Sequence, residues 1–399
     1  MSIPYEPGAP VKGMIPLSVP EIHGNEWAYV KQCLDTGWVS SVGSFVDRFE
    51  DEIAACLGVN HAVATVNGTA ALHIALLVAG VQPDEEVLVS TLTFIAPVNA
   101  IRYVGAWPVF IDAEPDYWQM SPQHLVDFLE RGCAWKDGVL RNRVTGRRVR
   151  AIIPVHILGH PVDMDPIMSL ARKFDLTVIE DACEGLGARY HGRMVGQIGD
   201  ISCLSFNGNK LLTTGGGGMI ATNRDDWAAR ARYLTTQAKD DPLEYIHGEI
   251  GYNYRLTNVQ AAIGCAQLEH LSEYVARKRE IAACYRRELA NTPGLSSMQE
   301  APGSYCTFWM YTILVNPGEY GETSRDLLRR LARRGIQARP LWQPMHQSPA
   351  HQDAAPSLCP IAERVHSQAL SLPCSVGLSP GDQLRVIESL VDRLRGIEP

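Results

Sequence analysis

Short apolar runs alternate with amphipathic or small-residue segments over the first 265 residues of the chain. The apolar runs have the length of buried strands and cover residues 61–66, 85–90, 107–113, 149–157, 176–181, 200–206 and 218–223. Segments with a helical pattern precede or separate several of them, at residues 20–37, 68–80, 96–105 and 163–175. Strands that alternate with helices predict a mostly parallel sheet covered on both faces, so we expect an α/β fold.

The pattern changes after about residue 265. A long charged helix is predicted over residues 268–291, followed by a strand at 307–315 and helices at 324–335 and 381–396. We therefore expect a large α/β domain over residues 1–265, whose first ~20 residues form an extended arm. A smaller α+β domain is expected over residues 266–399.

Composition and charge exclude several classes of protein. The 399 residues are 46% hydrophobic and 20% charged, as in proteins with a sizeable buried core. The net charge of −8 argues against nucleic acid or an anionic membrane surface as the main partner. The proline-rich N-terminus lacks the apolar core of a signal peptide, and no apolar run reaches the ~18 residues of a membrane span. Ten scattered cysteines without a C-x-x-C pair indicate reduced thiols, so we expect a cytoplasmic protein without a zinc site.

Residues 131–150 form an unusually basic segment with seven lysines and arginines. We expect a solvated hairpin that turns at Thr145 and Gly146. A basic edge that faces an anionic ligand is the alternative.

Several residues at predicted strand ends have side chains that could bind a ligand, although each alone could also have an ordinary structural role. Asp181 ends the run at 176–181, and ligands of open α/β sheets bind outside the carboxyl ends of strands. Its carboxylate can pair with a cationic ring nitrogen, or it can serve as a helix cap. Phe94 follows another strand and can stack on a flat ring, or it can belong to the core.

A second feature is the strand-to-helix turn at Asn67-Gly68-Thr69-Ala70. The glycine allows a ligand to approach the backbone closely. The threonine hydroxyl and the free N–H groups of the first helical turn form an anion site that suits phosphate. A plain capping turn is the alternative.

The third feature is the sequence SFNGNKLLTTGGGG at residues 205–218. Ser205 can donate to a phosphate, and Asn207 lies in a tight turn that directs Lys210 inward. A lysine amine can form an imine with an aldehyde, and the glycines let the chain pass close to the site. Together with the other two features, this set meets the needs of pyridoxal 5′-phosphate: an anion cradle, a ring stacker, a carboxylate for the pyridine nitrogen and a lysine.

The motifs N-G-T-A, T-F-I-A, E-D-A, S-F-N-G-N-K and G-Y-N-Y-R-L-T-N follow one another in the order found in a known family. From about Ile15 to the C-terminus, the chain resembles the sugar aminotransferases of the DegT/DnrJ/EryC1/StrS family. The resemblance implies the fold-type I architecture of pyridoxal-phosphate enzymes, with a seven-stranded sheet, and a homodimer with shared active sites. It implies that Lys210 bonds covalently to the cofactor. The cofactor-binding residues that it implies are Gly68, Thr69, Ala70, Phe94, Asp181, Glu184, Ser205, Asn207 and, from the neighbouring subunit, Asn253.

Two positions depart from the family pattern. Glu184 stands where many relatives have a glutamine that contacts the hydroxyl side of the cofactor, and a carboxylate there needs a proton or another partner. Gly216 stands where many relatives have glutamate in G-E-G-G. Lys210 itself excludes the subset of dehydratases that have histidine at this position, because histidine cannot form the imine.

Segments 37–50, 154–165 and 205–219 resemble the subgroup that aminates UDP-4-keto-6-deoxy-N-acetylglucosamine at C4. We therefore expect transfer of an amino group from L-glutamate to this nucleotide-linked keto sugar. The alternative substrate is GDP-4-keto-6-deoxymannose, as in perosamine-type enzymes, and C3 amination of a dTDP sugar is less favoured. The alternative outside the enzymes is a non-catalytic regulator that only binds the cofactor.

Four residues are candidates for binding the donor carboxylate and the sugar diphosphate: Arg255, Arg339, Trp342 and His346. The planar fork of arginine suits carboxylate and phosphate, although a surface salt bridge is the alternative for Arg339. His156 and His160 have the spacing of helical zinc ligands, but they lie at a strand end, so we expect no metal there. Tyr190 is expected near the site in a structural role.

Overall fold

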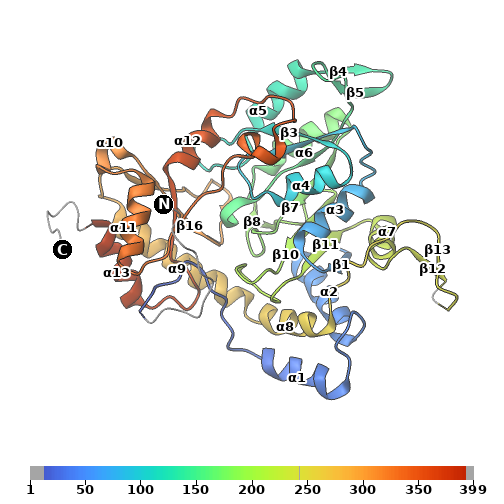
Figure 1. The fold of residues 1–399 in the computed structure, drawn as a ribbon, viewed down its shortest axis with the longest axis horizontal. Coiled ribbons are helices and arrows are strands. Elements are labelled where there is room, and N and C mark those ends of the chain that lie inside the picture. The colour runs from blue at the N-terminus through green and yellow to red at the C-terminus, as the bar shows by residue number, and fades with distance from the viewer. Residues whose placement is uncertain (1–12, 242, 392–399) are drawn as a thin grey trace.

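A computed structural model describes residues 13–241 and 243–391 of the chain. Its main sheet has seven strands in the order β1-β11-β10-β7-β6-β2-β3 (Figure 1). Their bounds are β1 His61–Thr65, β2 Glu86–Ser90, β3 Trp107–Ile111, β6 Val149–Ile153, β7 Thr177–Asp181, β10 Ile201–Ser205 and β11 Gly218–Thr222. Strand β11 is antiparallel to both of its neighbours, and the other pairs are parallel. The predicted α/β fold is confirmed, and each strand coincides with one of the apolar runs.

Helices cover both faces of this sheet because successive side chains of a strand point to opposite faces. Val87 and Val89 of β2 belong to one buried cluster, which includes residues of helices α2, α3, α4 and α8. Leu88 between them belongs to another cluster, with residues of α5 and α6. The helix bounds are α2 Ser44–Leu57, α3 Gly68–Val78, α4 Ala96–Tyr103, α5 Pro122–Asp127, α6 Met164–Phe174, α7 Asp225–Thr235 and α8 Asn258–Leu268.

The predicted helix at 20–37 is shorter in the structure. Helix α1 covers Glu26–Thr36 and ends at Gly37, whose left-handed φ of 75° suits glycine. Gly24 lies so close to the His270 ring that an added Cβ would be 2.7 Å from Nε2. Residues 20–25 are not helical, and a hydrophobic pattern does not reveal the approach of Gly24 to this ring.

The C-terminal part forms a smaller antiparallel sheet in the order β14-β16-β18-β17, flanked by helices. The bounds are β14 Leu295–Ser297, β16 Tyr311–Val315, β17 Arg339–Pro340, β18 Ala369–Leu372, α9 Leu271–Leu289, α10 Pro317–Tyr320, α11 Ser324–Arg333, α12 Pro360–Gln368 and α13 Pro380–Val391. This mixed composition agrees with the α+β prediction. Residue 265 falls inside α8, so the change from one pattern to the other comes at the end of that helix, and the domain division at residue 265 stays a prediction.

The described part of the N-terminal arm lies against this smaller sheet. The Ile15 N–H donates to the Gly335 carbonyl at 2.8 Å, and the Leu17 carbonyl accepts from the Cys374 N–H at 2.9 Å. The arm therefore joins the C-terminal sheet to α1. Residues 1–12 of the predicted arm lie outside the described residues.

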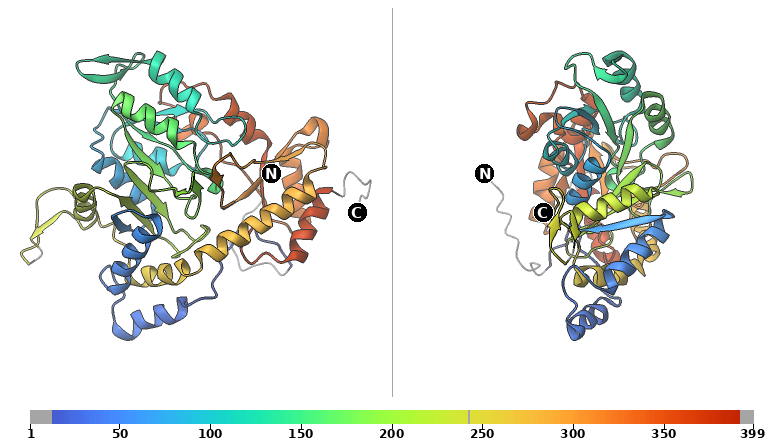
Figure 2. Two further views of the ribbon diagram at one scale, coloured as in Figure 1. Left: turned by 180° about the vertical axis from the view of Figure 1, so that it is seen from behind. Right: turned by 90° about the vertical axis from the view of Figure 1, so that its right-hand side faces the viewer.

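The basic segment at 131–150 has two turns instead of one. Strands β4 (Cys133–Lys136) and β5 (Val139–Asn142) form a hairpin that turns at Asp137 and Gly138, both with positive φ. The predicted turn at Thr145 and Gly146 follows as the second, because Arg141 pairs again with Arg148. Figures 1 and 2 show this hairpin and a second one, β12 (Lys239–Asp241) with β13 (Ile246–His247), extending from the body. The remaining short strands are β8 (Arg189–Tyr190), β9 (Arg193–Met194) and β15 (Ser304–Tyr305).

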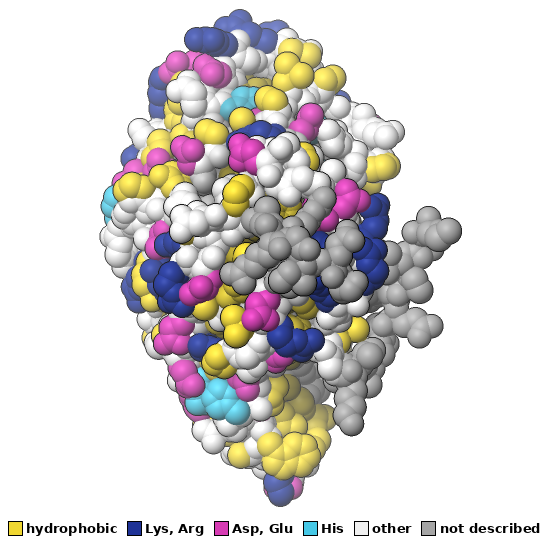
Figure 3. All heavy atoms as spheres, turned by 90° about the vertical axis from the view of Figure 1, so that its left-hand side faces the viewer, with side chains coloured by type: hydrophobic (Ala, Val, Ile, Leu, Met, Phe, Trp, Pro, Cys, Tyr) yellow, Lys and Arg dark blue, Asp and Glu magenta, His cyan; other side chains and the backbone are white. Residues whose placement is uncertain are grey.

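None of the helices among the described residues is long and apolar enough to cross a membrane. On the face shown in Figure 3, basic and acidic side chains are interspersed. This face therefore has no continuous field of one sign that would attract a polyanion.

Candidate active site

A cavity of about 300 Å³ lies at the carboxyl edge of the main sheet. Its walls come from the loops that follow β1, β2, β6, β7 and β10, and Trp309 and Trp342 of the C-terminal part complete it. Open α/β sheets bind ligands at this edge, and the volume is in the usual range for a small-molecule site.

Lys210 is held in the loop that follows β10. Its backbone N–H donates to the Asn207 carbonyl at 2.9 Å, which makes the predicted tight turn. Its amine lies 3.3 Å from a Glu184 carboxylate oxygen and 4.1 Å from the centroid of the Trp309 ring. The Trp309 indole N–H donates to the Asn209 carbonyl at 2.8 Å, so the ring that faces the amine is fixed to the same loop. The amine is thus directed into the cavity by an ion pair and a cation–π contact.

Glu184 has two protein partners, so both oxygens of the carboxylate at this position are engaged by the protein. One oxygen faces Lys210, and the other accepts from the Leu158 N–H at 2.9 Å. Leu158 has a φ of 61°, unusual for a residue with a branched side chain, and its N–H bond to Glu184 helps hold that conformation. Burial raises the pKa of Glu184, and the nearby Lys210 charge opposes the rise.

Asp181 is the last residue of β7 and is only 4% exposed. One carboxylate oxygen accepts from the Cys183 N–H at 3.1 Å. Burial raises the pKa of Asp181, because an ionised carboxylate is disfavoured away from water. A cationic N–H group in the cavity would relieve this cost.

The first turn of α3 contributes Gly68 and Thr69 to the wall of the cavity. The amides of Gly68 and Thr69 open the helix, where N–H groups have no intrahelical acceptor. A Cβ on Gly68 would lie 2.9 Å from both the Cys183 sulfur and the Ser205 Cβ, so only glycine permits this approach. These amides and the Ser205 hydroxyl are suited to an anion. The Ala70 N–H donates to the Asn67 side chain at 2.8 Å, and its predicted contact with phosphate stays a prediction.

Gly218, the last residue of the glycine run after Lys210, has no space for a side chain. A Cβ on Gly218 would lie 2.5 Å from the Asn67 carbonyl group and 2.7 Å from the Gly68 nitrogen. The start of β11 therefore passes directly against the predicted anion cradle, as expected from the sequence.

Most of the predicted residues meet in this one cavity. Those that line it are Gly68, Thr69, Phe94, Asp181, Glu184, Ser205, Asn207, Lys210 and Trp342. Phe94 is 54% exposed, which leaves its ring free to contact a ligand. The predicted residues outside the lining are Ala70, Asn253, Arg255, Arg339 and His346.

The residues outside the lining have different surroundings. His346 lies 2.7 Å from the Thr91 hydroxyl through Nδ1 and 3.1 Å from Glu363 through Nε2, so the substrate role predicted for it is not supported by its position. Arg339 is exposed on the short strand β17. Asn253 is exposed beside Thr236, with which it forms an isolated β-bridge.

Eight further residues line the cavity without having been predicted as site residues: Asn67, Thr93, Ala96, Pro97, Val155, Cys183, Asn209 and Trp309. Cys183 and Asn209 lie inside the motifs that predicted their neighbours, so their positions could have been included. Trp309 had no such indication, because it lies in an apolar run that reads as a buried strand.

The two histidines with zinc-like spacing are held by protein hydrogen bonds. The Nε2 atom of His156 lies 3.0 Å from Glu180, and its Nδ1 atom accepts from the Val162 N–H. His160 donates from Nδ1 to the Pro161 carbonyl and accepts at Nε2 from the Ala301 N–H. Both ring nitrogens of each histidine are therefore already engaged.

A sequence model of the DegT/DnrJ/EryC1/StrS aminotransferase family matches residues 20–391. The chain belongs to this family. Its similarity to individual members extends over nearly the whole chain. It is 41% identical to a GDP-perosamine synthase of Caulobacter vibrioides over 94% of this chain and 97% of the relative. The corresponding enzyme of Escherichia coli O157:H7 is 39% identical, with the same coverage.

Solved structures agree with this family assignment. The aminotransferase TlmJ of Streptoalloteichus hindustanus superposes with a TM-score of 0.86 at 29% identity, covering 96% of this chain and 99% of that one. DesV of S. venezuelae gives a TM-score of 0.83 at 32% identity, covering 94% and 95%. This chain is therefore a pyridoxal-phosphate-dependent nucleotide-sugar aminotransferase, as predicted.

The residues of the cavity fit pyridoxal phosphate. The amides at the start of α3 and Ser205 suit its phosphate, and the buried carboxylate of Asp181 suits a protonated ring nitrogen. The amine of Lys210 stands in the same cavity, where it can bond to the aldehyde carbon.

Proposed function

We propose that this enzyme transfers the amino group of L-glutamate to C4 of GDP-4-keto-6-deoxymannose. The observation that carries this choice is the 41% and 39% identity, over 94% of the chain, to two enzymes named GDP-perosamine synthase. A UDP-N-acetyl-3-dehydro-alpha-D-glucosamine 3-aminotransferase of Acidithiobacillus ferrooxidans is 36% identical over a smaller share, 81% of the chain. The GDP-linked substrate, which the sequence placed second, thus has stronger support than the UDP-linked one.

The residues of the cavity have distinct tasks in this proposal. Lys210 Nζ takes a proton from the α-carbon of glutamate in the first half-reaction and delivers one to C4 of the sugar in the second. Glu184 and Trp309 orient this amine between the two events. Asp181 keeps the proton on the ring nitrogen, and the bound cofactor supplies the electron-accepting ring.

A homodimer is part of the same proposal. Among the described residues that line the cavity, Lys210 is the only basic one. The carboxylate of glutamate and the diphosphate of the sugar nucleotide need further cationic or donor groups. We propose that Arg255 of a second copy of the chain supplies one such group and that Asn253 of that copy reaches the cofactor phosphate, which explains why these motif residues lie outside the cavity of their own chain.

The substrate can be tested by steady-state kinetics with the GDP-linked and the UDP-linked 4-keto sugars under the same conditions. The expected result is a kcat/KM at least ~100-fold higher for the GDP-linked ketone, because a site built for one sugar and base loses several contacts with the other. A higher kcat/KM for the UDP-linked ketone would overturn the choice of nucleotide and keep the aminotransferase.

A further inference from the structure

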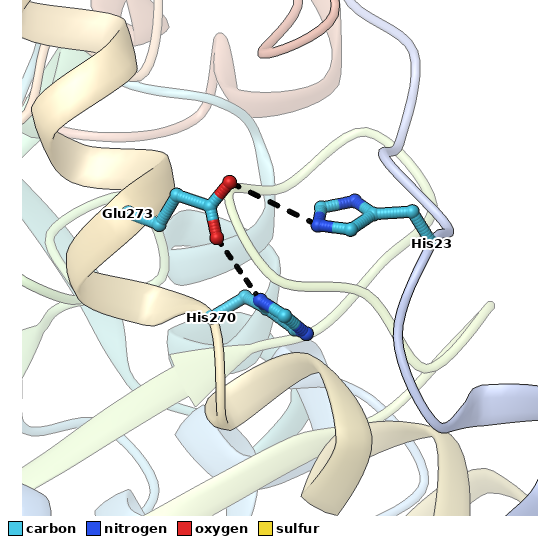
Figure 4. Close-up of side chains that lie close together, drawn as sticks. All are labelled: His23, His270 and Glu273. Atoms are coloured by element: carbon cyan, nitrogen blue, oxygen red, sulfur yellow. Dashed lines mark hydrogen bonds and ion pairs between the residues drawn. The ribbon is translucent and has the colours of Figure 1, made fainter.

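Three side chains with metal-binding atoms meet far from the cofactor cavity, where the segment before α1 crosses the start of α9 (Figure 4). His23 comes from that segment, and His270 and Glu273 come from the start of α9. One Glu273 oxygen lies 3.9 Å from His23 Nε2, and the other lies 3.1 Å from His270 Nδ1. The three ligand atoms all lie within 4.8 Å of one another. Two imidazoles thus face one carboxylate.

The surroundings direct the correct ring nitrogens toward this point. Gly24 lies against Nε2 of His270, so Nδ1 is the nitrogen left to face Glu273. The Tyr274 ring stacks on His270 with 5.8 Å between centroids and 18° between planes. On His23, Nδ1 lies 3.6 Å from a Glu21 oxygen. This is an ion-pair distance, and a slightly closer approach would form the carboxylate–imidazole hydrogen bond that usually orients metal-binding histidines.

We propose that His23, His270 and Glu273 bind a zinc-type divalent cation, with water in the remaining positions. Imidazole nitrogen and carboxylate oxygen are the ligands of three-residue zinc sites. Zn–ligand bonds of about 2.1 Å place tetrahedral ligand atoms about 3.4 Å apart. The three ligand atoms, one from each residue, lie within 4.8 Å of one another, so they must move closer to hold the ion, and the His23 side chain, 39% exposed, has room to adjust.

Binding of the cation would hold the N-terminal segment, residues 13–25, against α9. Residues 13–25 run from the smaller sheet to α1, held at one end by the Ile15–Gly335 hydrogen bond. At the other end, the Asn25 amide donates to Glu269 at 2.7 Å. A cation on His23 and Glu273 ties the same end of this segment to α9 as well. Because the ligands meet only in the folded chain, the cation stabilises the native state.

The test is calorimetric titration of ZnCl₂ into the metal-stripped, cofactor-loaded full chain. The expected result is one equivalent of zinc per chain, with affinity reduced more than ~10-fold in both His23→Ala and Glu273→Gln. His61→Ala is the matched control, because His61 is an exposed histidine whose ring pairs with Asp225 instead. Equal zinc binding by wild type and His23→Ala, or no binding by wild type, would overturn the proposal.

Hydrogen exchange gives a readout that does not depend on affinity. Zinc should slow exchange of the backbone amides at residues 20–26 in wild type and leave them unchanged in His23→Ala. MgCl₂ should have no such effect, because Mg²⁺ prefers oxygen ligands and retains its water. Slowing of exchange by both zinc and magnesium, or in both wild type and His23→Ala, would indicate a non-specific effect. It would contradict the proposal that zinc holds the N-terminal segment against α9.

Discussion

The amine of Lys210 lies 3.3 Å from the carboxylate of Glu184, and both side chains are largely withdrawn from water. The Leu158 N–H holds the other oxygen of the same carboxylate. The residue that serves as the cofactor lysine is therefore half of an ion pair within the protein. Such a pair orients the amine, and it makes each charge dependent on the other.

Removing one member of this pair should destabilise the protein more than removing both. Lys210→Met leaves the Glu184 carboxylate without its cation, and we expect a loss of about 1–3 kcal/mol in the free energy of unfolding. The double variant Lys210→Met/Glu184→Gln should regain at least ~1 kcal/mol of this loss. Urea unfolding of the cofactor-free proteins measures both changes. Strictly additive effects of the two substitutions would contradict the pairing.

Asp181→Asn should stabilise the cofactor-free protein and weaken its binding of the cofactor. Burial raises the pKa of Asp181 above its ordinary value of 3.8, so the ionised carboxylate destabilises the cofactor-free protein at neutral pH. The amide removes this cost, and we expect a gain of about 1 kcal/mol in cofactor-free stability with at least ~10-fold weaker cofactor binding. The gain should shrink as the pH falls through the raised pKa, because the wild-type carboxyl then becomes neutral as well. A cofactor-free variant less stable than wild type at neutral pH would contradict this account.

Shared active sites can be tested by mixing two inactive variants. Lys210→Ala removes the lysine from its own cavity, and Asn253→Ala removes the proposed contribution to the neighbouring one. In a mixed dimer, one site then keeps both residues, so co-expression at equal levels should restore roughly a quarter of the wild-type activity. Two Lys210→Ala chains with different tags are the control and should stay inactive. No recovery in the mixed dimer would place Asn253 in its own chain's site or outside any site.

His160 should make the protein sensitive to acid. Burial lowers the pKa of His160 to about 4, from an ordinary value near 6.5, because the charged imidazolium is disfavoured away from water. Protonation would also cost the bond that Nε2 accepts from the Ala301 N–H. The unfolded chain therefore binds more protons between these two values, and stability is lost as the pH falls through them, by up to about 3 kcal/mol. Urea unfolding at several pH values should show a shallower loss for His160→Gln than for wild type. Parallel curves would contradict a buried neutral histidine.

The sheet and much of the site could be predicted from the sequence because of one physical property of α/β folds. Strands of alternating α/β units present their carboxyl ends at one edge, so residues after separate strands, such as Thr69, Asp181 and Ser205, were expected to meet. Trp309 could not be predicted, because it enters the cavity from the C-terminal part through tertiary packing. The Asn67 side chain accepts from the Ala70 N–H, a local contact that the motif alone does not show, and the phosphate role of Ala70 stays a prediction.

The length of the helix at residues 20–37 shows the same limit. The predicted range begins at Pro20, but helix α1 begins at Glu26, and Gly24 lies against the ring of His270, more than 240 residues away in the sequence. A hydrophobic pattern does not show such contacts between distant segments, so it locates a helix better than it locates the helix start.

The most direct test of the central claim is a single-turnover transfer of labelled nitrogen. The holoenzyme is treated with ¹⁵N-L-glutamate, freed of glutamate by gel filtration and mixed with GDP-4-keto-6-deoxymannose. Mass spectrometry should find close to one ¹⁵N-labelled GDP-amino sugar per site, and none with Lys210→Ala. Labelled product from the UDP-linked ketone alone would contradict the substrate assignment, and label without Lys210 would contradict the assignment of the catalytic amine.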